Sequence, residues 1–354
     1  MLKKPVVKWV KSILACLAMC LICMSGLPRP GFAADYPELD GKTIRVIITA
    51  DPGDTTDQIS RIYFKGLQRE LPNVTIRIQN ISAPDKALKE LKSASESGVT
   101  LVTQGQSTIW RQLIKPDDSL DLTKVDWVGC LMQANHMLAI RKNMSATSVP
   151  DLLKMEGPVK FGASKFGSSL FEPLLVSALT KLRFKVVLGM SEGERHAMIL
   201  NGDLDARSGS RVELQPLFDN GEMVPLVKLK KDGFPKALDS VPALSDLVNP
   251  GSDGVVLSTI ETLDRQAGLL IASAKMADNA RLESLRRAVA VAAKSPDFVE
   301  EAEALGAAVK FTDGITLARE LEPIVDPASG IAAKVRAAIE CGQKKSETGQ
   351  ATCQ

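Results

Sequence analysis

Aromatic residues make up only 4% of the 354 residues, and the chain has no stripe of basic residues and no recognised nucleic-acid-binding motif. These absences exclude the usual nucleic-acid-binding classes, so no nucleic acid is expected as a partner. Histidine is scarce too, since only His136 and His196 occur. Neither stands in a zinc signature or in a motif with a nucleophile, so we expect no metal, no cofactor and no catalytic residue.

Cysteine is too sparse for a disulfide scaffold. Three of the six cysteines lie within the first 33 residues, which leaves Cys130, Cys341 and Cys353. An odd number of thiols cannot all pair within one chain. A disulfide between Cys341 and Cys353 can form in an oxidising compartment. Cys130, inside the apolar run WVGCLM, is expected to be a small buried residue.

The first 33 residues have the features of a secretory signal. Four lysines and no acid precede an apolar core at 12–27, and small residues stand at Gly31 and Ala33. We expect cleavage after Ala33 and a soluble periplasmic product; the alternative is an uncleaved anchor, for which the apolar run is short. The signal holds five of the 44 basic residues and none of the 42 acidic ones, so the mature chain has a net charge of −3.

Strands and helices alternate in the first part of the mature chain. Apolar, β-branched runs predict strands at 43–50, 74–81 and 99–105, and helical spacing predicts helices at 59–71 and 83–97. This alternation is typical of right-handed βαβ units in a mainly parallel sheet.

A long extended segment at 126–143 predicts a crossover to a second domain, where the pattern restarts. The expected elements there are a short capped helix at 148–155, strands at 158–164 and 184–189, and helices at 168–182 and 192–202. The apolar stretch 267–274 can carry the chain back, and the remainder is predicted to be helical with a loose tail from Gln343. We therefore expect one lobe from 34–133 plus 267–354 and another from 134–266.

Four loops stand at predicted carboxyl ends of strands, where open α/β sheets bind ligands. The first, TADPGDTTDQISR, joins a strand to a helix whose first amides lack intrahelical partners and favour negative charge. Gly53 permits close backbone approach, and Thr55 or Thr56 can cap. The loop therefore suits a carboxylate, although an ordinary βα turn has the same composition.

The second loop, at 161–169, brings Gly162, Ser164, Gly167 and Ser168 before a helix. Its glycine spacing is similar to that of a phosphate loop, but Ser168 occupies the position of the essential lysine, which argues against nucleotide chemistry. Carboxylate binding and a plain Gly/Ser turn both remain open. The other loops, at 103–108 and 205–210, complete an arrangement that fits a hinged binding protein.

These motifs together resemble the Bug-type periplasmic receptors of tripartite tricarboxylate transporters. The similarity lies in Tyr36 and Pro37 followed by IRVI, in PGDTTDQISR at 52–61, in FGASKFGS at 161–168, in LNGDLDA at 200–206 and in DSVPALSDL at 239–247. It covers essentially the whole mature chain. Although no one motif is decisive, their order and spacing together are specific.

The resemblance implies an α/β, two-lobed periplasmic binding protein (type II-like), with crossover strands as the hinge. It implies that the cleft closes on a small carboxylate, which an inner-membrane permease then takes up, and that the protein is a monomer. The implied ligand-binding residues are Gly53, Thr55, Thr56 and Asp57 on one wall, Ser164, Gly167 and Ser168 on the other, and Ser107 and Ser210 as further candidates.

Two residues depart from the family pattern in these loops. Asp54 replaces a glycine, and Lys165 adds a charge to the second loop. If both faced the cleft, they would favour a zwitterionic ligand over a plain carboxylate. The alternative is that both point to solvent.

Two other classes of protein compete with a transport receptor. One is a periplasmic hydrolase, and the other is a ligand sensor or interaction protein that signals to a membrane partner. Turnover of an ester or amide would identify the first class, and a neighbouring permease gene would argue against the second.

Overall fold

The computed structural model describes residues 36–94, 98–115, 121–249, 251, 253–266 and 268–350. The predicted signal peptide and Cys353 lie outside these residues. Glu38–Gln354 group into one unit by their contacts, and that unit is described here.

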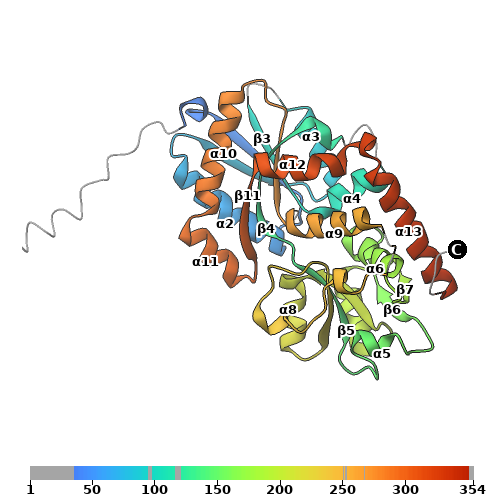
Figure 1. The fold of residues 1–354 in the computed structure, drawn as a ribbon. Coiled ribbons are helices and arrows are strands. Elements are labelled where there is room, and N and C mark those ends of the chain that lie inside the picture. The colour runs from blue at the N-terminus through green and yellow to red at the C-terminus, as the bar shows by residue number, and fades with distance from the viewer. Residues whose placement is uncertain are drawn as a thin grey trace, which may run out of the picture. The chain divides into compact units, whose positions relative to one another are not determined.

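The first of two β-sheets has the strand order β11-β4-β10-β3-β1-β2 (Figure 1). Its strands are β1 (Thr43–Ile48), β2 (Thr75–Asn80), β3 (Val99–Gln104), β4 (Val125–Gln133), β10 (Leu270–Ala274) and β11 (Ala308–Asp313). β1 pairs in parallel with β2 and β3. β10 is antiparallel to β3 and β4, and β11 is antiparallel to β4. β4 therefore runs in the direction of the first three strands.

The second sheet has the order β7-β6-β8-β5-β9. Its strands are β5 (His136–Arg141), β6 (Val159–Gly162), β7 (Phe184–Val187), β8 (Ala206–Ser210) and β9 (Met223–Lys228). β6 is parallel to β7 and β8, whereas β5 is antiparallel to β8 and β9. The predicted two-lobed α/β class is confirmed, with the refinement that both sheets are mixed, because β10 and β11 run against the other strands of the first sheet and β5 runs against those of the second.

Twelve α-helices accompany these strands in the described residues. They are α2 (Thr55–Glu70), α3 (Pro84–Lys92), α4 (Gln106–Ile114), α5 (Val149–Leu152), α6 (Ser168–Leu179), α7 (Glu192–Asn201), α8 (Arg211–Asp219), α9 (Gly254–Gln266), α10 (Asn279–Ala293), α11 (Pro296–Ala304), α12 (Gly314–Val325) and α13 (Ile331–Thr348).

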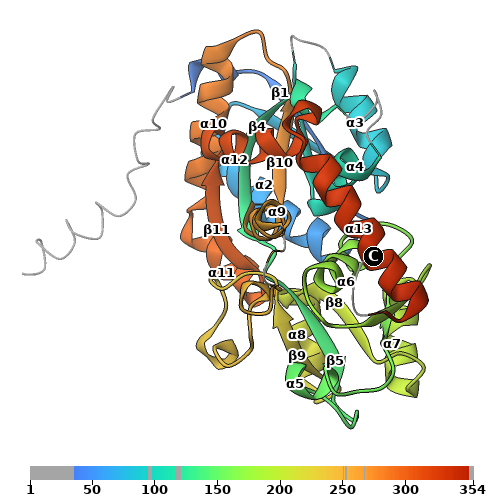
Figure 2. The same cartoon turned by 45° about the vertical axis from the view of Figure 1, so that its right-hand side comes forward.

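Helices cover both faces of the first sheet (Figure 2). α2, α10 and α11 contact one another in one layer, and α4, α9, α12 and α13 contact one another in a second layer. β4 touches α10 of the first layer and α9 and α12 of the second. This double cover explains why every residue of β3 and all but one residue of β4 are buried.

The chain passes between the sheets where β4 ends and β5 begins. Only Ala134 and Asn135 separate these strands, as the extended segment predicted. Asn135 is buried and has a positive φ of 50°. Its amide nitrogen donates to the Gly233 carbonyl at 2.7 Å, and its Oδ1 accepts from Lys230 Nζ at 2.6 Å. Side-chain hydrogen bonds therefore stabilise the unusual backbone at the crossover.

Two further segments connect the halves of the fold. α9 packs on β4 and α12 before β10 re-enters the first sheet, and α13 packs along α6, which follows a strand of the second sheet. Trp110 of α4 lies against Phe171 of α6, with ring centroids 5.6 Å apart. The lobe boundaries at 133/134 and 266/267 stay predictions.

Several local expectations from the sequence hold and others do not. Ser148 caps α5, as the predicted capped helix at 148–155 required, and Ser295 caps α11. The prediction of a loose tail from Gln343 is wrong in part, because α13 continues through residues 343–348. α4, α8, α9, β9 and β11 were not predicted. In α8, Pro216 breaks the expected sequence pattern of a helix.

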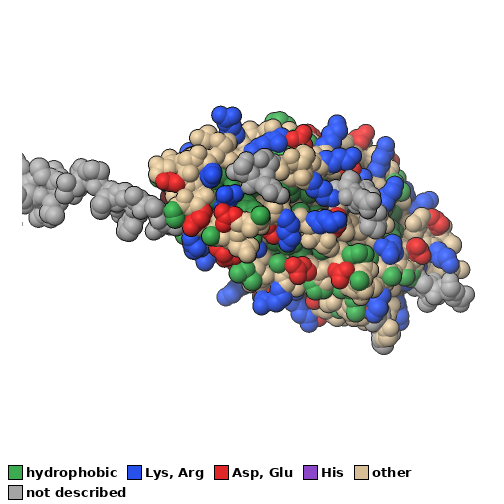
Figure 3. Space-filling model, turned by 90° about the horizontal axis from the view of Figure 1, so that it is seen from above, with side chains coloured by type: hydrophobic (Ala, Val, Ile, Leu, Met, Phe, Trp, Pro, Cys, Tyr) green, Lys and Arg blue, Asp and Glu red, His purple; other side chains and the backbone are tan. Residues whose placement is uncertain are grey.

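Basic and acidic side chains are interspersed on the face seen from above, with hydrophobic side chains scattered among them (Figure 3). No helix among the described residues is both long and apolar enough to cross a membrane.

Candidate functional site

A pocket of about 450 Å³ brings together six of the predicted ligand-binding residues. They are Asp54, Thr55, Thr56, Ser107, Ser168 and Ser210. The other lining residues are Ile59, Gly105, Gln106, Met132, Ala134, His136, Glu192, Val212, Glu213 and Gly268. Both sheets contribute to the pocket. The N-termini of α2 and α4 follow strands of the first sheet, and the N-termini of α6 and α8 follow strands of the second.

The first wall begins at α2. Gly53 has a φ of 91°, which favours glycine, and it turns the chain so that Asp54 can precede the helix. Asp54 is the N-cap residue, yet its side chain makes no cap hydrogen bond. Thr55 and Thr56 then present the first amides of α2 at the pocket.

α4 and α6 begin in the same way. Their N-cap residues are Gly105 and Gly167, so no side chain caps either helix. A Cβ on Gly167 would lie 3.9 Å from Cβ of Ser107, so these two helix ends approach each other across the pocket. Three helix N-termini without side-chain caps therefore meet at one pocket, where their partial positive charges add.

The N-termini of α7 and α8 differ from those of α2, α4 and α6, because each carries a complete capping box. In α8, Ser210 Oγ accepts the Glu213 amide at 3.3 Å, and the Ser210 amide donates to Glu213 Oε2 at 2.9 Å. Glu192 of α7 pairs with Arg195 and with the buried Arg207. Burial raises the pKa of Glu192, but both arginines outweigh this effect and lower it overall. These helix ends thus bring carboxylates to the pocket.

Five predicted residues do not line the pocket. Gly53 and Asp57 lie behind the first wall, where the Gly53 amide donates to Asp57 at 2.9 Å. Asp57 is buried and also accepts from Arg61 and Asn80. Burial raises the pKa of its carboxyl, but the hydrogen bonds from Arg61, Asn80 and Gly53 outweigh burial and lower it. Asp57 therefore braces the loop.

The remaining three residues outside the lining belong to the second loop. Ser164 Oγ donates to the Phe166 carbonyl at 2.8 Å and lies 2.8 Å from Ser169 Oγ, so it shapes the loop. Lys165 is exposed, and its Cε would lie 3.7 Å from a Cβ on Gly189. The loop glycine Gly167 has a φ of 115° and supplies the turn.

The main residue missed by the sequence analysis is His136, the first residue of β5. Its Nδ1 lies 2.5 Å from Oε1 of Glu172, which is fully buried in α6. Its amide donates to Oδ1 of Asp264 at 2.6 Å. Glu172 stands 36 residues away and Asp264 stands 128 residues away, so no local sequence signal links the three.

The buried ionisable groups around His136 shift one another's pKa values. Burial lowers the pKa of His136, but Glu172, Asp264 and Glu213 raise it to about 9. Burial raises the pKa of Asp264 to about 6 despite the nearby His136 and Lys230. Burial lowers the pKa of Lys230, whose Nζ lies 3.8 Å from Asp264 Oδ2. His136 is the member of this group that reaches the pocket.

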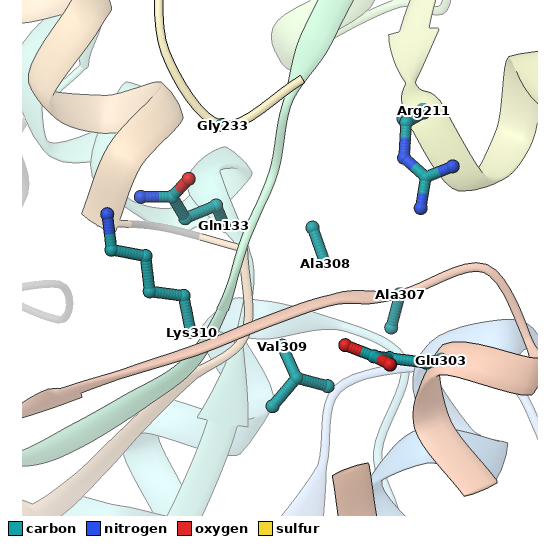
Figure 4. Close-up of a pocket in the computed structure, with 8 residues that line it drawn as sticks. All are labelled: Gln133, Arg211, Gly233, Glu303, Ala307, Ala308, Val309 and Lys310. Carbon is teal, nitrogen blue, oxygen red and sulfur yellow. The ribbon is translucent and has the colours of Figure 1, made fainter. Parts of the chain in front are cut away.

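A second hollow, of about 410 Å³, lies beside the crossover (Figure 4). Gln133, Arg211, Gly233, Glu303 and Ala307–Lys310 line it. None of the predicted ligand-binding residues is among them. Arg211 is already occupied, because its Nη2 donates to the Gly306 carbonyl at 2.9 Å. This contact links α8 to the loop before β11.

No group of three or more His, Cys, Asp or Glu side chains within the described ranges is arranged to hold a metal ion. Cys130 is buried and free. Cys341 is disulfide-bonded, and its predicted partner, Cys353, lies outside the described residues.

No family model and no curated protein matches the sequence. Solved structures do match. A TctC solute-binding protein from Polaromonas aligns with a TM-score of 0.64 at 14% identity, over 86% of this chain and 99% of that one. An R. palustris protein solved with adipate aligns with a TM-score of 0.64 at 16% identity, over 85% and 98%.

MatC from Rhodopseudomonas palustris, solved with bound malate, aligns with a TM-score of 0.59 at 16% identity, over 82% of this chain and 98% of that one. At identities this low, the alignments show similarity of fold alone. That fold agrees with the resemblance found in the sequence motifs. The chain therefore has the two-lobed fold of the TctC- and Bug-type periplasmic solute-binding proteins.

Proposed function

We propose that this chain is a Bug-type periplasmic receptor that captures a small organic acid between its lobes and delivers it to an inner-membrane permease of the tripartite tricarboxylate type. The convergence of the uncapped N-termini of α2, α4 and α6 on one pocket carries this proposal. Amides without intrahelical partners at the positive ends of three helices suit a carboxylate. Thr55, Ser107 and Ser168 add hydroxyl groups to the lining of the same pocket.

The size of the pocket and the nature of the neighbours support a small ligand. About 450 Å³ lies within the usual range for small-molecule sites. Two neighbours were solved with adipate and malate, which are both dicarboxylates. By analogy, a ligand of similar size with at least one carboxylate is expected here.

The lining also favours a positive charge on the ligand. Asp54 and Glu213 line the pocket together with Glu192, which is already paired with Arg195 and Arg207, whereas no lysine or arginine is among the lining residues. A plain tricarboxylate would meet these acids, while an ammonium group would gain from them. A zwitterion such as an amino acid therefore fits better, with its carboxylate at the helix ends.

Isothermal titration calorimetry on the protein purified from the periplasm tests this function. The probes are malate, adipate, citrate and aspartate. We expect one exothermic site for at least one of them, without consumption of the probe over hours of incubation as followed by NMR. Absence of binding to all four would contradict the carboxylate receptor, and conversion of a bound probe would favour an enzyme.

The remaining expectations need separate measurements. N-terminal sequencing should find Ala34 as the first residue of the exported protein, and light scattering should find a monomer. Small-angle X-ray scattering should show a smaller radius of gyration with ligand if the lobes 34–133 plus 267–354 and 134–266 close as a hinge. An intact Met1 in the membrane fraction would contradict the cleaved signal.

A further inference from the structure

His136 stands at the base of the pocket, where β4 passes into β5. Its side chain is only 13% exposed, yet the residue lines the pocket. Nδ1 is committed to Glu172 at 2.5 Å. Among the hydrogen bonds of the described residues, the His136 ring makes the one from Nδ1 and none from Nε2. One nitrogen is thus committed to Glu172, and Nε2 is available to a ligand.

Charged groups from three helices surround His136. Glu172 approaches from α6, Asp264 from α9 and Glu213 from α8. A buried cation, Lys230, lies 3.8 Å from Asp264 and donates to Asn135 at 2.6 Å. Because three carboxylates face His136, the imidazolium form is favoured over the neutral ring, and its pKa of about 9 is well above neutrality. In that form both ring nitrogens are donors.

We propose that His136 is the charged anchor of the binding site and donates Nε2–H, as an imidazolium, to a carboxylate of the ligand. The inference rests on the proposed receptor function and deepens it. The pocket contains the acids Asp54, Glu192 and Glu213 but no lysine or arginine, so His136 is the one side chain in its lining that can bring a full positive charge. Glu172 is then a positioning residue, which holds the ring and its charge.

A purely structural His136–Glu172 pair would also explain the 2.5 Å contact. The two roles differ in their effect on ligand affinity with pH. A charged anchor makes affinity constant near neutral pH and weaker above a pH of about 9, where the ring loses its proton. A structural pair leaves the pH profile of affinity unrelated to His136.

The test is calorimetry with malate and adipate from about pH 7 to pH 10 on wild type, His136→Gln, Glu172→Gln and the control His196→Gln. Loss of a charge-assisted hydrogen bond in His136→Gln should weaken binding about 10- to 100-fold at neutral pH. The decline at high pH should vanish in this variant. If the decline persists, it belongs to another group such as Lys230, which His136→Gln retains.

Glu172→Gln should change the pH dependence of ligand affinity, which a purely structural His136–Glu172 pair would not do. Removing the carboxylate leaves burial to lower the pKa of His136, so the fall in affinity should move to lower pH. His196→Gln should behave as wild type, because His196 does not line the pocket. Circular dichroism and melting temperature establish that each variant is folded.

NMR of the imidazole rings keeps the inference testable without any ligand. The chain has two histidines, so His196→Gln assigns both resonances. His136 should titrate near pH 9. If none of malate, adipate, citrate and aspartate binds wild type, the proposed function and this inference fall together. If one binds and His136→Gln leaves its affinity and pH profile unchanged, the inference alone is overturned.

Discussion

The backbone N–H of Gly53 donates to the carboxylate of Asp57 at 2.9 Å, one turn into α2. This bond closes the loop that presents Asp54 and Thr55 to the pocket. Asp57 adds bonds to Arg61 and Asn80, at 2.9 and 2.8 Å, and so ties the loop to the end of β2. A residue outside the pocket thereby determines the shape of its wall.

Asp57→Ala should lower the free energy of unfolding by about 1–3 kcal/mol at neutral pH, because buried donors lose their acceptor. The pKa of Asp57 is below its usual value of 3.8, so its contribution is full above that value and is lost as the pH falls through the lower folded pKa. Urea unfolding between about pH 7 and pH 3 should show the difference from wild type shrinking in acid. The exposed neighbour Asp54→Ala serves as control and should change stability little. An equal effect of both substitutions would contradict the bracing role.

Gly53→Ala and Gly41→Ala form a matched pair for the loop conformation. Both glycines have positive φ, 91° and 67°, and a Cβ at either would meet no atom within 4 Å. Each substitution should cost about 1 kcal/mol of stability through backbone strain alone. Only Gly53→Ala should weaken malate binding, since only Gly53 leads into α2. Equal affinities of the two variants for malate would argue against a site at this helix end.

Ser168→Leu and Ser295→Ala should have opposite effects. Ser168 lines the pocket at the start of α6, so leucine there removes a hydroxyl and fills space, and affinity should fall more than about tenfold with little loss of stability. Ser295 caps α11 away from the pocket, and its loss should cost about 1 kcal/mol with affinity unchanged. Calorimetry and thermal melts of both variants make the comparison. Full affinity in Ser168→Leu would mean that ligand binds elsewhere.

Asp54→Asn tests the charge preference of the ligand. If Asp54 faces an ammonium group, the variant should bind aspartate more weakly and malate more strongly, because the two probes differ in that group. Lys165→Ala is the control, since Lys165 lies outside the pocket lining, and it should leave both affinities unchanged. Parallel changes for the two probes in Asp54→Asn would contradict the zwitterion preference.

Gly342→Ala tests the packing of α13 on α6. A Cβ at Gly342 would overlap the carbonyl of Leu174, which is backbone and cannot move aside alone. We expect a loss of about 1–3 kcal/mol. Gly193→Ala, in α7 and with no atom within 4 Å of the new Cβ, should instead gain up to about 1 kcal/mol from helix propensity. Denaturant unfolding of the two variants would show the contrast, and a neutral Gly342→Ala would mean that the helices are not in close contact.

Local chemistry predicted several of the residues that line the pocket. A glycine followed by hydroxyl residues at the end of a strand marks a helix start, as at Gly53 and Gly167, and such starts gather at one edge of an α/β sheet. Thr55, Thr56 and Ser168 were predicted in this way, and Ser107 and Ser210 were predicted only as residues of loops at strand ends. Asp57 and Ser164 have the same local sequence pattern, but their side chains turn back into the loop. The sequence could not distinguish them from residues that line the pocket.

Sequence by itself determined the alternation of strands and helices, the extended segment at 126–143 and the starts of α2 and α6, because hydrophobic period, turn residues and caps act over a few neighbours. Tertiary structure alone decided which of those ends face one pocket, that Lys165 lies outside its lining, and that both sheets are mixed. It also decided the surroundings of His136. The Glu172 and Asp264 carboxylates that contact it come from distant helices, and only packing brings them within hydrogen-bonding distance of one residue.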